Sequence, residues 1–269
     1  MYPYKVFLDM GLYDICLLLG VIIVFFLADK MGIKKGFSIA LQKTLIISAL
    51  LAVTIGYGFA VLFQAFYNFL DGGAFEIVSS TGATFYGGLI GGAAAFIISW
   101  FVVGKLLCKS DEPIRRFLDI ADIAAVCIPL AHGFGRVGCF FAGCCHGAET
   151  TAWYGVNMYT EAGWKTVVPV QLFEAIFLFM LSGGIFALFK TGKNGKVALL
   201  SIYLIVYGIW RFFIEFARAD DRGATIISAL SPSQLIAIIL IAVGIGFVFL
   251  AQKLQQMNKE KEDEREESL

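Results

Sequence analysis

Seven stretches of the sequence are long and apolar enough to cross a lipid bilayer, and this feature limits the folds open to the chain. A membrane-spanning helix needs about 20 mostly apolar residues in a row. Hydrophobic residues make up 59% of the chain and charged residues only 16%, so the chain is more apolar than a typical soluble domain. The sequence therefore predicts an all-α integral membrane protein with seven transmembrane helices. The predicted spans are Met10 to Ala28, Thr44 to Phe66, Thr84 to Leu107, Ile120 to Phe141, Pro169 to Phe189, Val197 to Ala217 and Pro232 to Ala251.

The first span begins close to Met1, where a cleaved signal peptide is the alternative interpretation. Asp9 and Asp14 stand where a signal peptide carries basic residues, and no small-residue cleavage site precedes Asp29. We therefore expect this span to be a retained helix.

Basic residues follow alternate spans. Fifteen of the 21 lysine and arginine residues lie after spans one, three, five and seven. Because basic residues favour the cytoplasmic side, the N-terminus is predicted outside and the C-terminus inside. These residues are Lys30, Lys34, Lys35, Lys43, Lys105, Lys109, Arg115, Arg116, Lys190, Lys193, Lys196, Lys253, Lys259, Lys261 and Arg265.

The remaining sequence suggests one membrane domain over residues 1–252 and a charged, helical cytoplasmic tail over residues 253–269. The loop from Gly143 to Val168 contains four aromatic residues that suit the membrane interface, where it could act as a lid. These are Trp153, Tyr154, Tyr159 and Trp164. The sequence shows no internal repeat, so it does not favour an inverted-repeat transporter.

Polar residues of five spans gather at one predicted depth, near the outer end of the bundle. Ionisable residues inside a span are costly and usually face a cavity or a charged partner. Tyr207, Arg211, Glu215 and Arg218 follow at intervals of four, four and three, which places them on one helical face. The converging residues are Tyr13, Asp14, Tyr86, His132, Arg136, Gln171, Glu174, Arg211, Glu215 and Arg218.

Arg136 is the strongest candidate for binding an anion. It lies within GFGRVG, where glycines allow close approach, and a guanidinium binds phosphate through paired hydrogen bonds. The other charged residues also have structural interpretations: Glu215 as an ion-pair partner and Arg218 as an interfacial anchor. For Glu174, the structural interpretation as a bridge between helices is slightly favoured.

Cys139, Cys144, Cys145 and His146 form a Cys-x4-Cys-Cys-His pattern, which is not a usual zinc spacing. Packing of small cysteines beside glycines is favoured, with a disulfide from Cys139 to Cys144 or Cys145 as the alternative. We expect neither a metal nor an organic cofactor. The other cysteines are predicted apolar fillers: Cys16, Cys108 and Cys127.

The run GRVGCFFAGCCHG, from Gly135 to Gly147, resembles the signature of the bacterial prolipoprotein diacylglyceryl transferase family. That signature has the form Gly-Arg-x-Gly-Asn-Phe, followed by a glycine after a fixed gap. Four further segments are similar to the family: FYGGLIGG, PVQLFEA, YGIWRFFIEFAR and LSPSQ. The resemblance covers most of the chain from the third span onward and implies a seven-helix membrane fold with its N-terminus outside.

The resemblance implies a transfer of diacylglyceryl from phosphatidylglycerol to the lipobox cysteine of a prolipoprotein. The reaction forms a thioether and releases glycerol phosphate. The implied partners are phosphatidylglycerol, signal peptides with a lipobox cysteine and membrane lipids, with no nucleic acid. The implied location is the bacterial inner, or cytoplasmic, membrane, with the active site toward the outer leaflet.

Combined with the residue chemistry, the resemblance gives Arg136 and Arg211 the role of holding the phosphodiester and stabilising the charge of the leaving phosphate. Glu215 would orient Arg211 or help receive the thiol proton. The predicted catalytic residues are Arg136, Arg211, Glu215, Tyr86 and His132. The predicted substrate-binding residues are Tyr13, Gly87, Gly88, Gly135, Gly138, Cys139, Gly147, Glu174, Tyr207 and Arg218, the last nearer the rim.

Three positions depart from the family pattern. Tyr86 stands in place of the usual histidine, Cys139 in place of the asparagine, and Cys144 in place of an acidic residue. A phenol is a poorer base than an imidazole at neutral pH, so His132 is the alternative proton acceptor. Two other functions stay open: a divergent transferase with cysteine involvement and another acceptor, or a non-catalytic protein that binds anionic lipid or signal peptides.

Overall fold

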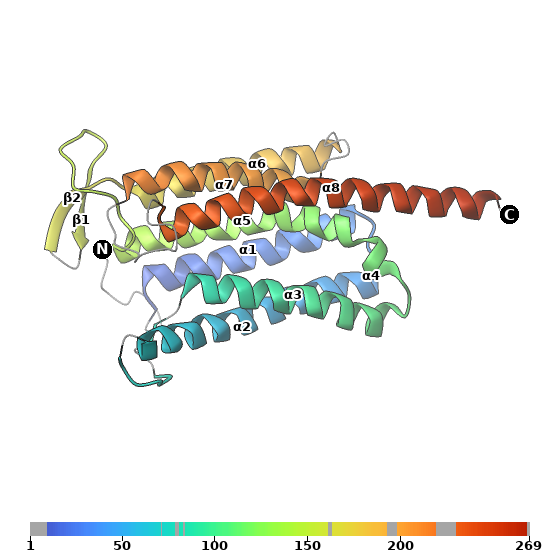
Figure 1. Cartoon of the computed structure of the whole chain (residues 1–269), viewed down its shortest axis with the longest axis horizontal. Coiled ribbons are helices and arrows are strands. Elements are labelled where there is room, and N and C mark those ends of the chain that lie inside the picture. The colour runs from blue at the N-terminus through green and yellow to red at the C-terminus, as the bar shows by residue number, and fades with distance from the viewer. Residues whose placement is uncertain are drawn as a thin grey trace. The chain divides into compact units, whose positions relative to one another are not determined.

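The computed structural model describes residues 10–70, 72–78, 81–82, 84–160, 163–192, 198–218 and 230–267, without the side chains of residues 85, 86 and 258–267. Seven of the described helices are long and apolar enough to cross a membrane, which confirms the predicted number. They are α1 (Leu12–Lys34), α2 (Ile39–Leu70), α3 (Phe85–Cys108), α5 (Phe117–Ala142), α6 (Val170–Thr191), α7 (Leu199–Ile214) and α8 (Pro232–Glu267), shown in Figure 1.

Four shorter elements complete the described structure. Helix α4 (Glu112–Arg115) follows α3, and a 3-10 turn (Glu215–Ala217) extends α7. Strands β1 (Val156–Thr160) and β2 (Gly163–Val167) form an antiparallel hairpin between α5 and α6. Helix α8 continues unbroken through the charged tail as far as Glu267.

The chain forms two compact units. The first contains Met1–Phe26 and Leu118–Leu269, and the second contains Leu27–Phe117. Helix α1 therefore contributes residues to both. The prediction of one membrane domain followed by a tail remains a prediction.

In the second unit, α2 and α3 pack closely through small residues. A Cβ atom added to Gly91 would lie 2.4 Å from Cβ of Phe59, and one added to Gly87 would lie 2.7 Å from Cβ of Phe63. Such close approach gives van der Waals contact, which drives helix association where lipid is as apolar as the side chains. Glycines on α3 are thus required by its contact with α2.

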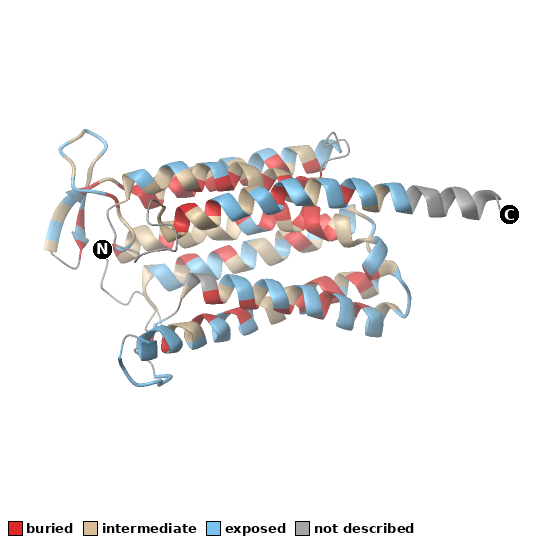
Figure 2. Cartoon of the chain, viewed as in Figure 1, coloured by how far each residue is buried: buried red, intermediate tan, exposed pale blue. Residues whose placement is uncertain are grey.

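In the first unit, polar side chains join α5 to its neighbours. The buried Ser182 hydroxyl on α6 donates to the Val126 carbonyl, 2.9 Å away. The buried Asp122 carboxylate accepts the Leu199 amide at 2.8 Å, at the first residue of α7. Half of the α5 span is buried, which is a larger share than in any other described span. Figure 2 colours the described residues of each helix by their burial. Helix α5 is therefore the centre of this unit.

The hairpin was not predicted, although its aromatic residues were singled out. Tyr159 pairs with Trp164 across the strands, with ring centroids 5.6 Å apart. Trp153 is 94% exposed and Trp164 is 67% exposed. Large exposed aromatic rings of this kind fit the predicted membrane interface.

Candidate active site

The candidate site lies where four helices of the first unit have their ends. Arg136 is near the C-terminal end of α5, and Glu174 is near the N-terminal end of α6. Arg211 is in the last turn of α7, and Ser233 is in the first turn of α8. Because successive helices run in opposite directions, residues so far apart in sequence reach the same end. The predicted site residues of α5, α6 and α7 therefore lie at one end of this helix group.

Glu174 is the centre of one charged group. Its carboxylate is fully buried, and its Oε2 lies 2.9 Å from Nε of Arg136. Its Oε1 accepts a hydrogen bond from the Tyr207 hydroxyl at 3.0 Å, and Nε2 of His132 lies 3.9 Å from the same oxygen. His132 and Tyr207 also meet edge to face, with ring centroids 5.4 Å apart. Glu174 thus connects three helices, as its structural interpretation anticipated.

Glu215 is the centre of a second charged group. Its Oε2 lies 2.9 Å from Nη2 of Arg211, which is the ion pair expected from the four-residue spacing. Its Oε1 accepts a hydrogen bond from the Ser231 hydroxyl at 2.8 Å. Nη2 of Arg211 also donates to Oγ of Ser233 at 2.7 Å. Ser231, just before α8, therefore holds Glu215, and Ser233, in the first turn of α8, holds Arg211.

Arg218 departs from the prediction of a single helical face. Helix α7 ends at Ile214, the next turn is a 3-10 turn, and Arg218 has an extended backbone with φ −87° and ψ 151°. Nε of Arg218 lies 4.0 Å from Oε2 of Glu215, and its side chain is only 2% exposed. Arg218 is therefore a buried neighbour of Glu215, and its place nearer the rim of the site stays a prediction.

The two groups act on each other and carry excess positive charge. The Arg211 guanidinium interacts electrostatically with both Glu174 and His132. In these two groups three arginines, Arg136, Arg211 and Arg218, face two glutamates, Glu174 and Glu215, so the guanidinium groups outnumber the carboxylates by one. Nη1 of Arg211 is buried and meets no hydrogen-bond partner within the described part of the chain. A buried guanidinium in this state is suited to an anion that brings its own acceptors.

Gly147 fixes the loop after α5 against Arg218. The two residues form an antiparallel bridge, and the Gly147 amide donates to the Val168 carbonyl at 2.8 Å. A Cβ atom on Gly147 would lie 2.5 Å from the carbonyl oxygen of Ala217. The glycine is thus needed for this contact between chain segments, a structural role beside the predicted one in substrate binding.

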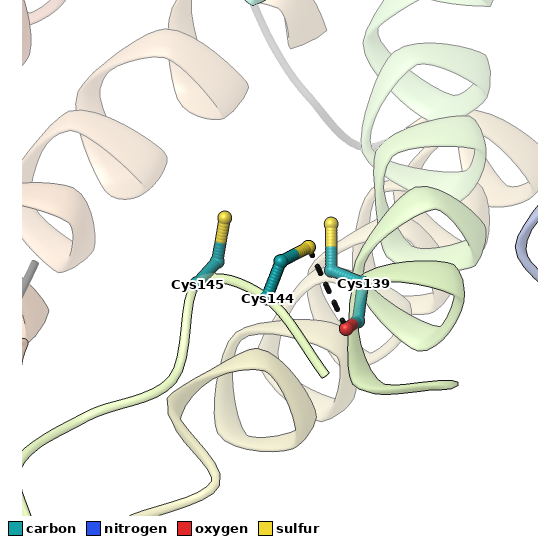
Figure 3. Close-up of side chains that lie close together, drawn as sticks. All are labelled: Cys139, Cys144 and Cys145. Atoms are coloured by element: carbon teal, nitrogen blue, oxygen red, sulfur yellow. Dashed lines mark hydrogen bonds between the residues drawn. The ribbon is translucent and has the colours of Figure 1, made fainter. Parts of the chain in front are cut away.

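Cys139, Cys144 and Cys145 bring their sulfur atoms together at this loop, as Figure 3 shows. The three Sγ atoms lie within 4.8 Å of one another, and all three residues are free cysteines. The Cys144 thiol donates to the Cys139 carbonyl at 3.7 Å, and the fully buried Gln171 amide donates to the Cys144 carbonyl at 2.6 Å. Cys145 has a φ of 60°, a conformation that non-glycine residues seldom adopt.

The two loop cysteines differ in acidity. Hydrogen bonds from the thiols of Cys139 and Cys144, together with the Arg218 guanidinium, lower the pKa of Cys145 well below its usual range. Hydrogen bonds with Cys139 and Cys145 raise the pKa of Cys144, and burial adds to this effect. Cys145 is therefore the sulfur most readily present as a thiolate.

The other predicted residues have different positions. Gly138 is buried against Tyr13, since an added Cβ atom would lie 3.0 Å from the Tyr13 ring. Gly135 has more room, with the nearest atom to such a Cβ at 3.7 Å, on Leu17. These contacts place the start of α1 beside the end of α5, close to Cys139.

The remaining predicted residues lie in the second unit or outside the described residues. The side chain of Tyr86 lies outside the described residues. Gly87 and Gly88 belong to the contact of α3 with α2 described above. The sequence interpretation gave no role to Ser231 and Ser233, although LSPSQ, which contains both, was one of the family-like segments. Two hydroxyls two positions apart at a helix start were the signal available.

These observations define a multi-pass membrane protein with a buried, arginine-rich site where four helices end. The family model "Prolipoprotein diacylglyceryl transferase" matches residues 4–250. The chain belongs to this family of membrane transferases, as its motifs predicted.

Relatives of known designation agree. The chain is 33% identical to the phosphatidylglycerol--prolipoprotein diacylglyceryl transferase of Clostridium tetani over 88% of this chain and 91% of the relative. It is 40% identical to phosphatidylglycerol--prolipoprotein diacylglyceryl transferase 2 of Clostridium perfringens over 61% of this chain and 60% of that relative. A relative of the same designation from Dehalococcoides mccartyi, strain CBDB1, is 31% identical over 84% of both chains.

Proposed function

We propose that this protein transfers the diacylglyceryl group of phosphatidylglycerol to the lipobox cysteine thiol of a prolipoprotein. The observation that carries the proposal is the buried cluster in which Arg136, Arg211 and Arg218 outnumber Glu174 and Glu215. A phosphodiester would supply the missing negative charge. The family membership and the designations of the relatives support the same substrates.

In this reaction the lipobox sulfur attacks the glycerol carbon that carries the phosphate. A carbon–sulfur bond forms, the carbon–oxygen bond breaks, and its electron pair goes to the phosphate oxygen of the departing glycerol phosphate. Arg136 and Arg211 would bind the phosphate and stabilise this charge, which is the role of preorganised cations. Glu174 and Glu215 are positioning residues in this scheme because each fixes a guanidinium.

His132 is better suited to positioning than to receiving the thiol proton. Its ring contacts Tyr207, its Nε2 lies near Glu174, and its side chain is 13% exposed. Glu174 is itself held by Arg136 and Tyr207. The imidazole therefore belongs to the network that holds Arg136, and the proton of the acceptor thiol needs another destination.

The proposed orientation follows from the basic loops. With the N-terminus outside and the C-terminus in the cytoplasm, the C-terminal ends of α5 and α7 face outward. The site would then lie at the outer leaflet of the bacterial inner membrane. There a phospholipid headgroup and the lipobox of a translocated prolipoprotein can both reach it.

The test is mass spectrometry of a lipobox peptide incubated with the purified protein and phosphatidylglycerol. We expect a diacylglyceryl mass gain with the wild type and no gain with Arg136→Ala. The matched control is Arg115→Ala, because Arg115 is an exposed arginine of the second unit, and this variant should retain the gain.

Each result is decisive. A wild type that binds phosphatidylglycerol but forms no product would overturn the proposal in favour of a lipid-binding protein. A mass gain with Arg136→Ala equal to that of the wild type would remove Arg136 from the phosphate site.

A further inference from the structure

The proposed transfer requires a thiolate, which the residues around Glu174 do not readily supply. A free cysteine thiol has a pKa of about 8.5, so only a small fraction is ionised at neutral pH. His132 is engaged with Glu174 and Tyr207. A group that holds the acceptor sulfur in its ionised form would remove this obstacle.

The three cysteine sulfurs at the loop after α5 are suitable metal ligands for such a group. The Sγ atoms of Cys139, Cys144 and Cys145 lie within 4.8 Å of one another. In a tetrahedral zinc site the sulfurs are about 3.8 Å apart, as follows from a zinc–sulfur bond of about 2.3 Å. The three sulfurs would therefore need to approach by about 1 Å or less to share one ion.

The backbone presents the three side chains together. Cys139 is on the last turn of α5, whose end is followed by Gly143 with a φ of 69°. The loop then reverses, and Cys144 and Cys145 return toward Cys139 (Figure 3). The Gln171 amide holds this reversal through the Cys144 carbonyl. The convergence therefore depends on the local backbone, and the sequence spacing, which is not a usual zinc spacing, does not reveal it.

The charged residues around the three cysteines favour the binding of several thiolates to one metal ion. The Arg218 side chain hydrogen-bonds to the Cys145 sulfur, and the Arg136 guanidinium interacts electrostatically with Cys139. Each of these guanidinium groups favours a thiolate beside it, while Arg211, whose Nη1 is buried and meets no partner among the described residues, is left to bind the phosphate. Nδ1 of His146 instead meets the carbonyl oxygen of Gly147 at 2.9 Å, and His146 is not among the converging ligand atoms.

We propose that Cys139, Cys144 and Cys145 bind a zinc ion, and that its fourth position binds the sulfur of the lipobox cysteine. This inference rests on the proposed function. Three protein ligands with one open position are the arrangement of catalytic rather than structural zinc sites. The proposal replaces our interpretation of these cysteines as packing residues.

The chemistry balances without any change of oxidation state. A thiol that coordinates zinc gives up its proton to solvent, and the metal holds it as a thiolate. This sulfur then attacks the lipid carbon, and the thioether that forms is a weaker ligand that can leave zinc. The phosphate departs with the electron pair of the broken carbon–oxygen bond, next to the arginines.

The first experiment uses cobalt(II) as a spectroscopic substitute for zinc in the reduced, detergent-purified full-length protein. We expect one equivalent to give thiolate-to-cobalt charge-transfer bands and the visible bands of a tetrahedral ion, and zinc to displace it. Cys139→Ser, Cys144→Ser and Cys145→Ser should each weaken binding at least tenfold. Cys108→Ser is the matched control, because Cys108 lies in the second unit, and it should bind cobalt as the wild type does.

Three outcomes of this experiment overturn the metal site. They are a wild type without these bands, bands that persist in the three serine variants, and an intact mass two hydrogens short, which shows a disulfide among the cysteines. The wild-type spectrum tests metal binding whether or not the serine variants fold, and the variants that fold test which cysteines bind the metal.

The second experiment adds a lipobox peptide to the cobalt-loaded wild type. We expect the charge-transfer band to intensify as a fourth sulfur binds, and no change with a peptide that carries alanine in place of the acceptor cysteine. Identical spectra with both peptides would show that the metal does not bind the acceptor. Product formation by a wild type that binds no cobalt would overturn this inference alone, whereas a cobalt–peptide complex without product would overturn the proposed transfer.

Discussion

In the second unit, α2 and α3 pack through glycines and alanines, whereas in the first unit α5, α6 and α7 meet through arginines, glutamates and a tyrosine. Gly91 and Phe59 represent the first type of contact, and Arg136 and Glu174 the second. Small residues give close packing at little electrostatic cost, whereas buried charges must be paired to be tolerated. The comparison indicates that the first unit retains its charges for a reason other than packing, which is the proposed reaction.

The largest expected effect comes from breaking the ion pair at the centre of the first unit. In Glu174→Leu the Arg136 guanidinium remains buried without its partner, which costs about 3–5 kcal/mol in comparable cases. We expect a marked fall in the thermal unfolding midpoint in detergent and loss of diacylglyceryl transfer.

The double variant Arg136→Met with Glu174→Leu separates stability from function. Replacement of a buried ion pair by apolar residues of similar volume is often neutral for stability, so the unfolding midpoint should recover. Transfer should stay absent, because the phosphate ligand is gone. Recovery of transfer in the double variant would show that the pair serves packing alone.

The second effect tests the packing of the other unit. In Gly91→Ala the new methyl group meets Cβ of Phe59, and overpacking of this kind typically costs about 1–3 kcal/mol. We expect a lower unfolding midpoint but an unchanged transfer rate per folded molecule. Gly58 lies on α2 of the same unit, and an added Cβ atom there would meet open space, so Gly58→Ala should leave the unfolding midpoint and the transfer rate unchanged. A loss of rate without a loss of stability in Gly91→Ala would contradict a purely structural role.

Sequence reasoning predicted the features that depend on local pattern. The seven spans follow from apolar length, and the Arg211–Glu215 pair follows from helical spacing. The ion pair of Arg136 with Glu174 could not be predicted, because residues expected at the same depth in the membrane are not all in contact. The extended backbone of Arg218 did not follow either, because α7 ends in a 3-10 turn just after Ile214, a change that the apolar pattern does not mark.

The hairpin and the sulfur cluster required information that periodicity does not contain. The pairing of Val156–Thr160 with Gly163–Val167 depends on hydrogen bonds between strands. The meeting of Cys139 with Cys145 depends on the positive φ of Gly143 and of Cys145 itself. Both features lie in the loop after α5, where backbone conformation rather than helix pattern determines which residues meet.

A third, smaller effect compares two serines, one in each unit. In Ser231→Ala, Glu215 loses a hydrogen bond of 2.8 Å, and bonds to charged groups contribute about 1.5–3 kcal/mol. Part of this free energy should be lost from the transition state, because Arg211 is held less firmly, and the transfer rate should fall by about 3- to 10-fold. Ser48→Ala is the control: Ser48 is buried in the second unit, and its hydroxyl meets no partner among the described residues. Equal effects of the two substitutions would remove the distinction between the units at this level.

The smallest effect concerns the relative reactivity of Cys144 and Cys145 in the reduced, metal-free protein. Exposure favours Cys144, which is exposed, whereas Cys145 is half-buried. Charge favours Cys145, because hydrogen bonds from the neighbouring thiols and the Arg218 guanidinium lower its pKa, whereas the pKa of Cys144 is raised. Since a lowered pKa keeps the thiolate populated at lower pH, maleimide should modify Cys145 first near neutral pH, at a rate that changes little with pH. Modification of Cys144 should accelerate only as the pH becomes alkaline.

Peptide mapping by mass spectrometry after short maleimide exposures measures both rates, and Arg218→Gln sharpens the result. Loss of the guanidinium removes one cause of the lowered pKa of Cys145, so its modification should slow relative to Cys108 at acidic pH, where ionisation of the thiol limits the rate. Faster labelling of Cys144 in the wild type would show that exposure, not charge, controls this loop. An unchanged Cys145 rate in Arg218→Gln would leave the neighbouring thiols as its only source of activation, and the charged region of the first unit would then end at Glu215.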